Sequence, residues 1–130
     1  MHEWRSHTAE IELAIESESE ESVFAEAAAA FGELIGLEER GRRVERDVSI
    51  EAADRNALLV QWLEELIFLA DTESFVPETA REVRLEGSAM RATLVGRHAS
   101  VEPLVKAATY HGLSFAHEDG VWRARVVLDV

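Results

Sequence analysis

The stretch GVWRARVVLDV, residues 120–130, decides the fold that the rest of the chain can adopt. Apolar and polar residues mostly alternate along it, which is the period of a half-buried β-strand. Trp122 and Leu128 fall on the apolar face and are predicted to lie in the core, whereas Asp129 falls on the polar face. Because aspartate is depleted in strands, its place beside Val130 needs an explanation.

A second alternating stretch lies at the other end of the chain, over Arg5–Glu16. We expect one strand here, with Ala9 and Leu13 on its buried face and Glu10 on its polar face. Strands near the two ends of a domain often pair because chain termini tend to lie close together. If these two strands pair, the carboxylates of Glu10 and Asp129 converge with the terminal carboxylate of Val130. Hard cations bind such oxygen clusters; the alternative, which the pattern alone favours, is a solvated or salt-bridged strand end.

Two helices are predicted between these strands. In the first, SESEES (17–22) offers Ser17 or Ser19 as the N-cap, apolar residues follow at helical spacing, and Gly36 is the expected stop. In the second, Asp54 is the expected cap of a helix with a wide apolar face from Leu58 to Ala70, which includes Trp62. This second helix is predicted to be the centre of the core.

The other segments are predicted to be extended. Gly87-Ser88 and Asp119-Gly120 are two-residue hairpin signals, and Pro77 is expected to interrupt the chain after the second helix. The predicted strands cover Arg43–Ala52, Ala80–Leu85, Ala89–Val95, Leu104–Tyr110, Leu113–His117 and Val121–Asp129. The order strand-helix-strand-helix-strands predicts an α+β fold with a largely antiparallel sheet system, in a single domain over residues 1–130.

The charge balance limits the possible partners. The chain has 26 acidic against 13 basic residues, a formal net charge of -13. Because nucleic-acid affinity comes largely from neutralising phosphates, no direct nucleic-acid binding is expected; a basic protein or a cation is a better partner. No apolar segment is long enough to span a bilayer, so we expect no membrane contact and a cytoplasmic location.

Signals of catalysis are lacking. Cysteine is absent, which excludes thiol chemistry. The sequence has no Gly-rich phosphate loop, no GxSxG and no HExxH. These residues do not assemble an active site, and we expect a protein that is not an enzyme.

Four stretches together resemble the archease family. They are HTAEIEL (7–13), NALLVQWLEELIFLADTE (56–73), VKAATYHGL (105–113) and GVWRARVVLDV (120–130). The resemblance implies a small α+β accessory protein that activates the RtcB-type RNA ligase, promoting its guanylylation and its turnover in tRNA splicing or RNA repair. It also implies a divalent-cation site, in which the acid of the family pattern HTAD falls on Glu10 and the penultimate acid on Asp129.

On this resemblance the metal ligands would be Glu10, Asp129 and the carboxylate of Val130. The cation would be calcium, with magnesium or manganese as alternatives. Lys106 and His111 would lie at the surface that contacts the ligase.

The sequence departs from the family pattern at several positions. Glu10 stands for the usual aspartate, and Glu12 stands where the family often has glycine. An acid common after the first helix is missing from LIG (34–36), where Glu33 or Glu38 could substitute. Two other functions stay open: a metal-dependent hydrolase that uses the same carboxylates, and a chaperone-like module that binds another protein.

Overall fold

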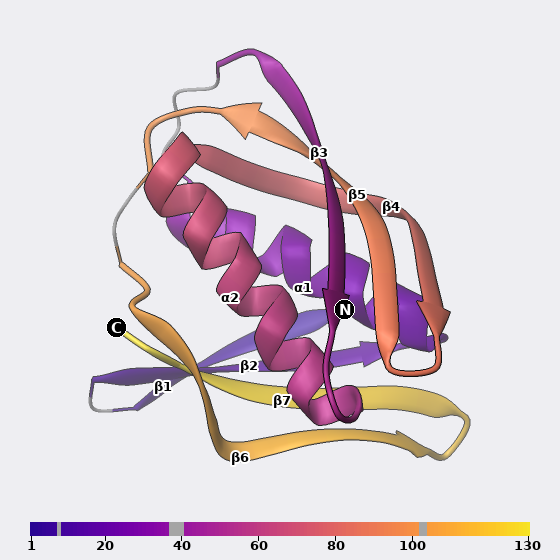
Figure 1. The fold of residues 1–130 in the computed structure, drawn as a ribbon. Helices are drawn as coiled ribbons and strands as arrows, with labels where there is room; N and C mark the ends of the chain where they lie inside the picture. The colour runs from indigo at the N-terminus through magenta and orange to yellow at the C-terminus, as the bar shows by residue number, and fades with distance from the viewer. Residues whose placement is uncertain (8, 37–40, 102–103) are drawn as a thin grey trace.

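The chain forms two antiparallel sheets with two helices between them (Figure 1). The computed structural model describes residues 1–7, 9–36, 41–101 and 104–130. A four-stranded sheet has the order β1-β2-β7-β6, and a three-stranded sheet has the order β3-β5-β4. The predicted α+β class with a largely antiparallel sheet system is confirmed.

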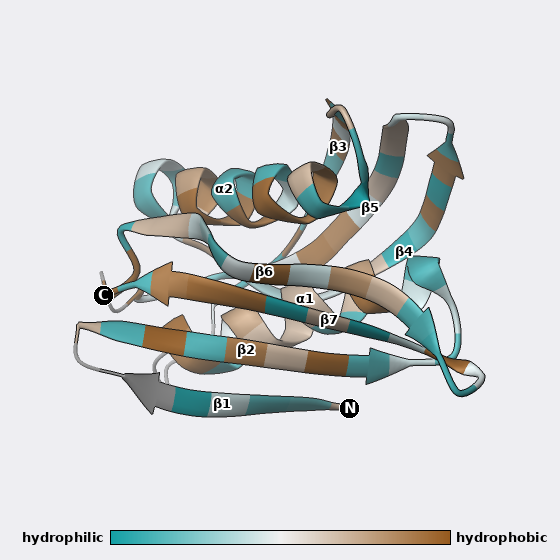
Figure 2. Cartoon of the chain, turned by 90° about the horizontal axis from the view of Figure 1, so that it is seen from below, coloured by the Kyte–Doolittle hydropathy of each residue, from teal (hydrophilic) through white to brown (hydrophobic). Residues whose placement is uncertain are grey.

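The elements have the following bounds: β1 His2–His7, β2 Glu10–Ser17, α1 Glu20–Ile35, β3 Arg43–Glu51, α2 Arg55–Glu73, β4 Phe75–Glu86, β5 Ala89–His98, β6 Ala107–Glu118 and β7 Val121–Asp129. α1 packs against β4 and β2, and α2 packs against β6. Coloured by hydropathy, the strands of the larger sheet show alternating bands along their length (Figure 2). No helix among the described residues has the length and hydropathy needed to cross a membrane.

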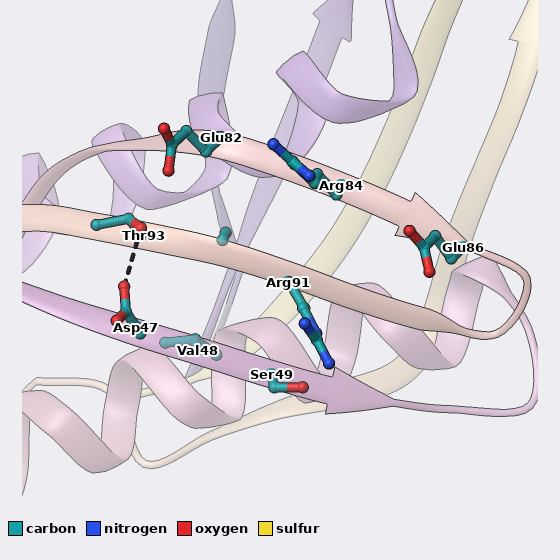
Figure 3. Close-up of a pocket in the computed structure, with 9 residues that line it drawn as sticks. Asp47, Val48, Ser49, Glu82, Arg84, Glu86, Arg91 and Thr93 are labelled. Atoms are coloured by element: carbon teal, nitrogen blue, oxygen red, sulfur yellow. Dashed lines mark hydrogen bonds between the residues drawn. The ribbon is translucent and has the colours of Figure 1, made fainter.

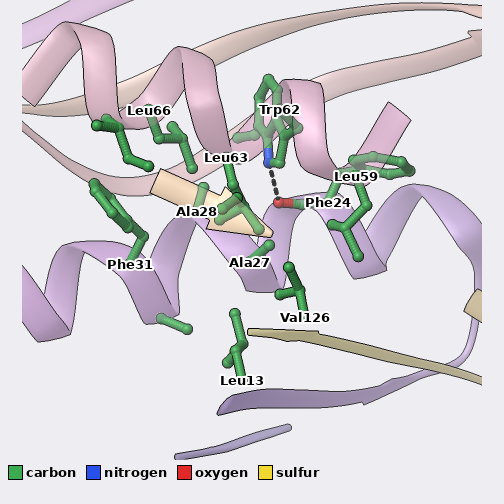
Figure 4. Packing of buried hydrophobic residues seen from close by; sticks show 14 of the residues in the cluster. Leu13, Phe24, Ala27, Ala28, Phe31, Leu59, Trp62, Leu63, Leu66 and Val126 are labelled. Atoms are coloured by element: carbon green, nitrogen blue, oxygen red, sulfur yellow. Dashed lines mark hydrogen bonds between the residues drawn. The ribbon is translucent and has the colours of Figure 1, made fainter. Parts of the chain in front are cut away.

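The core forms where α1 meets α2 and the larger sheet (Figure 4). Trp62 of α2 is fully buried, as predicted, and its indole N–H donates to the carbonyl of Phe24 at 2.9 Å. The rings of these two residues also meet edge to face, with centroids 6.2 Å apart. Leu13 of β2 and Val126 of β7 lie below α1 and are fully buried. Trp122 is only partly buried, at the margin of this core, where it stacks on His117.

The helix boundaries follow the predicted signals. Ser19 is the N-cap of α1: its hydroxyl accepts from the Ser22 N–H at 3.1 Å, and the Ser22 hydroxyl accepts from the Ser19 N–H at 3.2 Å. The Asp54 carboxylate caps α2 by accepting from the Ala57 N–H at 2.8 Å. Gly36 ends α1 as expected, but with an extended backbone of φ -74° and not the left-handed one that glycine often supplies.

The prediction of one strand over Arg5–Glu16 is wrong, because the chain turns back and forms β1 and β2 there. Ala9, predicted to be buried, is an exposed turn residue with φ 59°. The turn has no glycine, proline or asparagine to announce it, and β1 is an edge strand of largely polar sequence. The periodicity that predicts strands therefore did not mark it.

Two further predictions need correction. Pro77 does not interrupt the chain but lies inside β4, opposite Gly96, next to a register shift. Its missing N–H is tolerated because β4 is an edge strand. The two pieces predicted over 104–110 and 113–117 join in one strand, β6, which begins at Ala107 and has an irregular register between Thr109 and Ser114.

One position in α1, Gly32, requires glycine because the helix lies very close to the backbone of β4. A Cβ on Gly32 would lie 1.8 Å from the carbonyl oxygen of Pro77. In an open helix position, Gly32→Ala would stabilise by about 1 kcal/mol. Here we expect it to lower the free energy of unfolding by about 1–3 kcal/mol, because α1 must move off β4. Urea unfolding measures the change; unaltered or higher stability would show that α1 does not lie on β4 in this way.

The N-terminal edge strand is tied to α1 through His2. Its Nδ1 lies 3.0 Å from Glu26, and its Nε2 contacts Glu33. Burial by itself would lower the pKa of His2, but the hydrogen bonds and charges of the two glutamates outweigh it and raise the pKa above 6.5. Protonated His2 therefore stabilises the docked position of β1.

Because the folded pKa of His2 is raised, its contribution to stability is complete below pH 6.5 and is lost as the pH rises through the folded pKa. We expect the free energy of unfolding of the wild type to fall over that pH range relative to a His2→Gln variant. Urea unfolding at a series of pH values measures the difference. An exposed-histidine variant, His111→Gln, is the control and should keep the wild-type profile; parallel profiles for wild type and His2→Gln would contradict the contact.

Candidate acidic site on the outer sheet face

The register of β2 on β7 places Glu10 directly opposite Asp129. Both side chains lie on the sheet face that points away from the helices, and both residues are partly exposed. Directly opposed residues have Cβ atoms about 5 Å apart, so the two carboxylates are neighbours. The strands predicted to pair do so, and this pairing places the two acidic residues side by side.

The backbone around Asp129 is held from both sides. Its carbonyl accepts from the N–H of Lys106 at 2.8 Å, and the N–H of Val130 donates to the carbonyl of Ala9 at 3.2 Å. The Val130 side chain packs against the core. Val130 can therefore contribute to the acid pair only through its backbone.

Glu12 has a different role from its neighbour Glu10. It is the one charged residue in the described part of the chain that is classed as buried, at 6% exposure. One of its oxygens lies 3.3 Å from Arg5 of β1 and the other lies 3.1 Å from Arg125 of β7. It thereby links three strands, and each of its oxygens contacts a guanidinium group. The sequence shows a charged residue where the resemblance leads one to expect glycine. No local pattern indicates that two arginines from other strands pair with it.

The donor set limits what the site can hold. Among the described residues no group of three or more histidine or acidic side chains is arranged to bind a metal. Glu33 is bound to His2, which lies opposite Ile15, about 16 Å along β2 from Glu10 at the usual rise per residue. Glu38 lies outside the described residues. Glu10 and Asp129 supply carboxylate oxygens of the kind that calcium and magnesium prefer, and water would have to complete the coordination shell.

The predicted contact residues lie at the exposed edge of the same sheet. Lys106 is exposed, and it precedes β6 where this strand meets Asp129. His111 is exposed in the irregular part of β6, next to Gly112 with φ 65°. Lys106 is therefore adjacent to the acid pair, while His111 lies between the two stretches of β6 that pair with β7.

A concavity of about 430 Å³ lies on the other sheet, over the solvent side of β3, β5 and β4 (Figure 3). Arg84 and Arg91 are directly opposite each other in its lining, and their side chains point in different directions. Three acids, Asp47, Glu82 and Glu86, surround them. The lining has no excess of positive charge for an anion, and it shares no residue with the acid pair.

The structure thus defines a small α+β protein whose helices lie between two antiparallel sheets, with paired carboxylates on one outer face. The sequence matches the Archease protein family over residues 2–130. The chain belongs to this family.

Similar proteins cover nearly the whole chain. It is 34% identical over 140 residues to the protein archease of Methanosarcina mazei, covering 99% of this chain and 95% of that one. It is 36% identical over 121 residues to the protein archease of Methanothermobacter thermautotrophicus, covering 85% and 84%.

Two solved structures share the fold. The solution structure of Methanobacterium thermoautotrophicum protein 1598 has a TM-score of 0.71 and 28% identity, and covers 99% of this chain and 98% of that chain. The crystal structure of a Thermotoga maritima archease, described as a possible chaperone, has a TM-score of 0.68 and 22% identity, and covers 100% and 98%.

The Glu12 bridge is testable by stability. Glu12→Gln keeps the size of the side chain but removes the charge between Arg5 and Arg125. Because both arginines are about half exposed and can turn to water, we expect a loss of about 1–2 kcal/mol in the free energy of unfolding. The control is Glu16→Gln on the same strand face, whose longer pair with Arg123 at 3.5 Å is exposed. Equal, small effects of both variants in urea unfolding would refute a special role for Glu12.

Proposed function

We propose that this protein is a non-enzymatic activator of an RtcB-type RNA ligase, promoting the guanylylation and turnover of that enzyme. The observation that carries the proposal is the acid pair Glu10–Asp129, fixed by strand register on an exposed sheet face of a family member. Such a pair has two uses in an activator. It can hold a divalent cation, or it can present carboxylates to basic groups of the ligase.

The electrostatics of the chain favour a protein partner over RNA. With a net charge of -13, the protein repels a phosphate backbone and attracts a basic surface. An RNA ligase must carry a basic surface to bind its substrate. In this proposal the acid pair contacts that surface, and Lys106 and His111 at the adjoining sheet edge lie at the contact.

A cation is the second part of the proposal. Glu10 and Asp129 would bind calcium first, with magnesium or manganese as alternatives, and Val130 would add an oxygen. A bound cation would screen the repulsion between the two carboxylates and supply positive charge at the contact. The chain's own residues hold the site in register through the β2–β7 ladder.

The alternatives are a protein-binding chaperone and a hydrolase. The description of the Thermotoga maritima archease as a possible chaperone favours protein binding in general. A hydrolase needs a metal with an open position and a base beside it, and no observation on the described residues favours one. A panel of phosphoesterase substrates with added calcium, magnesium or manganese tests the hydrolase directly.

The activator is tested by measuring the ligase–GMP adduct. Purified ligase with GTP and manganese should form more adduct with this protein than without it. Asp129→Asn and Glu10→Gln should each reduce the stimulation by about tenfold or more, the size expected for removing a charged contact in a binding interface. The control is Asp119→Asn, an acid in the β6–β7 turn at the other end of β7, which should stimulate like the wild type. If the wild type gives no stimulation, the activator function is wrong.

Cation binding is measured without the ligase. Calorimetric titration of the protein with calcium should give one weak site that Asp129→Asn removes and Asp119→Asn keeps. Full adduct stimulation by a protein that binds none of the three cations would leave the acid pair as a direct contact and remove the cation from the proposal.

A further inference from the structure

Phe68 is an exposed aromatic residue in the middle of α2. The helix α2 buries most of its apolar residues, yet Phe68 is 56% exposed. A single exposed apolar residue is ordinary on a protein surface. Phe68 differs from such a residue because two acids flank it on the helix surface.

Two acids flank Phe68 on the same helix face. Glu65 precedes it by three residues and Asp71 follows it by three, which is the spacing of surface neighbours in an α-helix. Neither acid has an ion-pair or hydrogen-bond partner in the described part of the chain. Two nearby acids differ in this respect: Glu64 accepts from the Ala108 N–H at 2.9 Å, and Glu73 binds Arg46 at 2.7 Å.

A second exposed apolar residue lies on the segment that packs beside α2. Leu104, which is 36% exposed, lines a small crevice together with Ile67 and Asp71. The crevice has a volume of about 10 Å³, which holds at most one water molecule. This surface is therefore too shallow for a small molecule and suits a protein chain laid across it.

The same segment joins this surface to the acid pair. Leu104 lies against α2, and Lys106, two residues further on, donates its N–H to the Asp129 carbonyl. Ala108 is then bonded to Glu64 of α2. One partner could therefore contact α2 and the edge of the larger sheet together.

We propose that the Phe68 surface, defined as Phe68, Leu104, Glu65 and Asp71, docks a basic segment of the partner ligase. An arginine or lysine of that segment would lie over the Phe68 ring, where a desolvated cation–π contact forms, and its neighbours would pair with the two free carboxylates. Leu104 would contact the apolar stem of the same basic side chain. The inference rests on the proposed function, and it adds the surface of this protein at which the ligase binds.

The test measures affinity and activity separately. In a calorimetric titration with the purified ligase, Phe68→Ala should raise Kd by about tenfold or more, as expected for an aromatic anchor. At saturating protein, adduct formation should return to the wild-type level, because the acid pair is untouched. Phe68→Trp should keep the affinity, since tryptophan binds cations at least as well.

The charge component has a matched control. The double variant Glu65→Gln/Asp71→Asn should weaken binding and reduce its dependence on salt concentration. The double variant Asp47→Asn/Glu86→Gln removes the same charge from the other sheet and should bind like the wild type. Because Phe68 is exposed, its variants should unfold at the wild-type temperature, which shows that they are folded.

The outcomes separate the two proposals. If Phe68→Ala binds the ligase with the wild-type Kd while the wild type stimulates adduct formation, the docking surface is overturned and the activator function stands. Equal weakening by both double variants shows that only overall charge matters, and also overturns the surface. If the wild type neither binds nor stimulates the ligase, the activator and the docking surface both fall.

Discussion

The pairing register of β2 on β7 is the constraint on which the rest of the structure depends. Side chains alternate between the two faces of a strand, so a shift of one residue would turn Leu13 to solvent and Glu12 toward α1. The same shift would separate Glu10 from Asp129. Core packing therefore fixes Glu10 and Asp129 opposite each other, and the two residues need no interaction of their own to stay adjacent.

The distribution of ion pairs explains why an acidic chain keeps free carboxylates at particular places. Acidic residues outnumber basic ones two to one, so internal pairing cannot neutralise them all. Arg5 and Arg125 converge on buried Glu12, and Arg55 binds Glu20 at 2.6 Å, joining the two helices. Arginines are thus engaged where strands and helices must be held together. Acids in excess remain on the outer sheet face, on α2 and on the solvent side of the smaller sheet, and these surfaces are open to a basic partner.

The sequence predicted elements whose periodicity agrees with their local signals. α2 combines the Asp54 cap with a wide apolar face, and the hairpins at Gly87-Ser88 and Asp119-Gly120 combine turn residues with flanking alternation. Prediction failed where tertiary context decides. Pro77 is tolerated because β4 is an edge strand. In β1 only Trp4 is apolar, so its sequence does not show the alternation that predicts a strand. For the site, alternation placed Glu10 and Asp129 on polar faces and the register confirmed their pairing. The burial of Glu12 depends on two arginines from other strands, which no local pattern contains.

The Glu12 bridge also affects the charges beside the acid pair. Strand alternation places Arg125 on the same sheet face as Asp129, four residues before it along β7, and Glu12 pairs with its guanidinium at 3.1 Å. The negative charge of Glu12 offsets the charges of Arg5 and Arg125, so the potential beside Glu10 and Asp129 is more negative than these two guanidinium groups alone would leave it. Glu10 adds a methylene to the family aspartate and so reaches further from the strand. A potential that stays negative and the longer reach of Glu10 suit either a cation or a positive group of a partner.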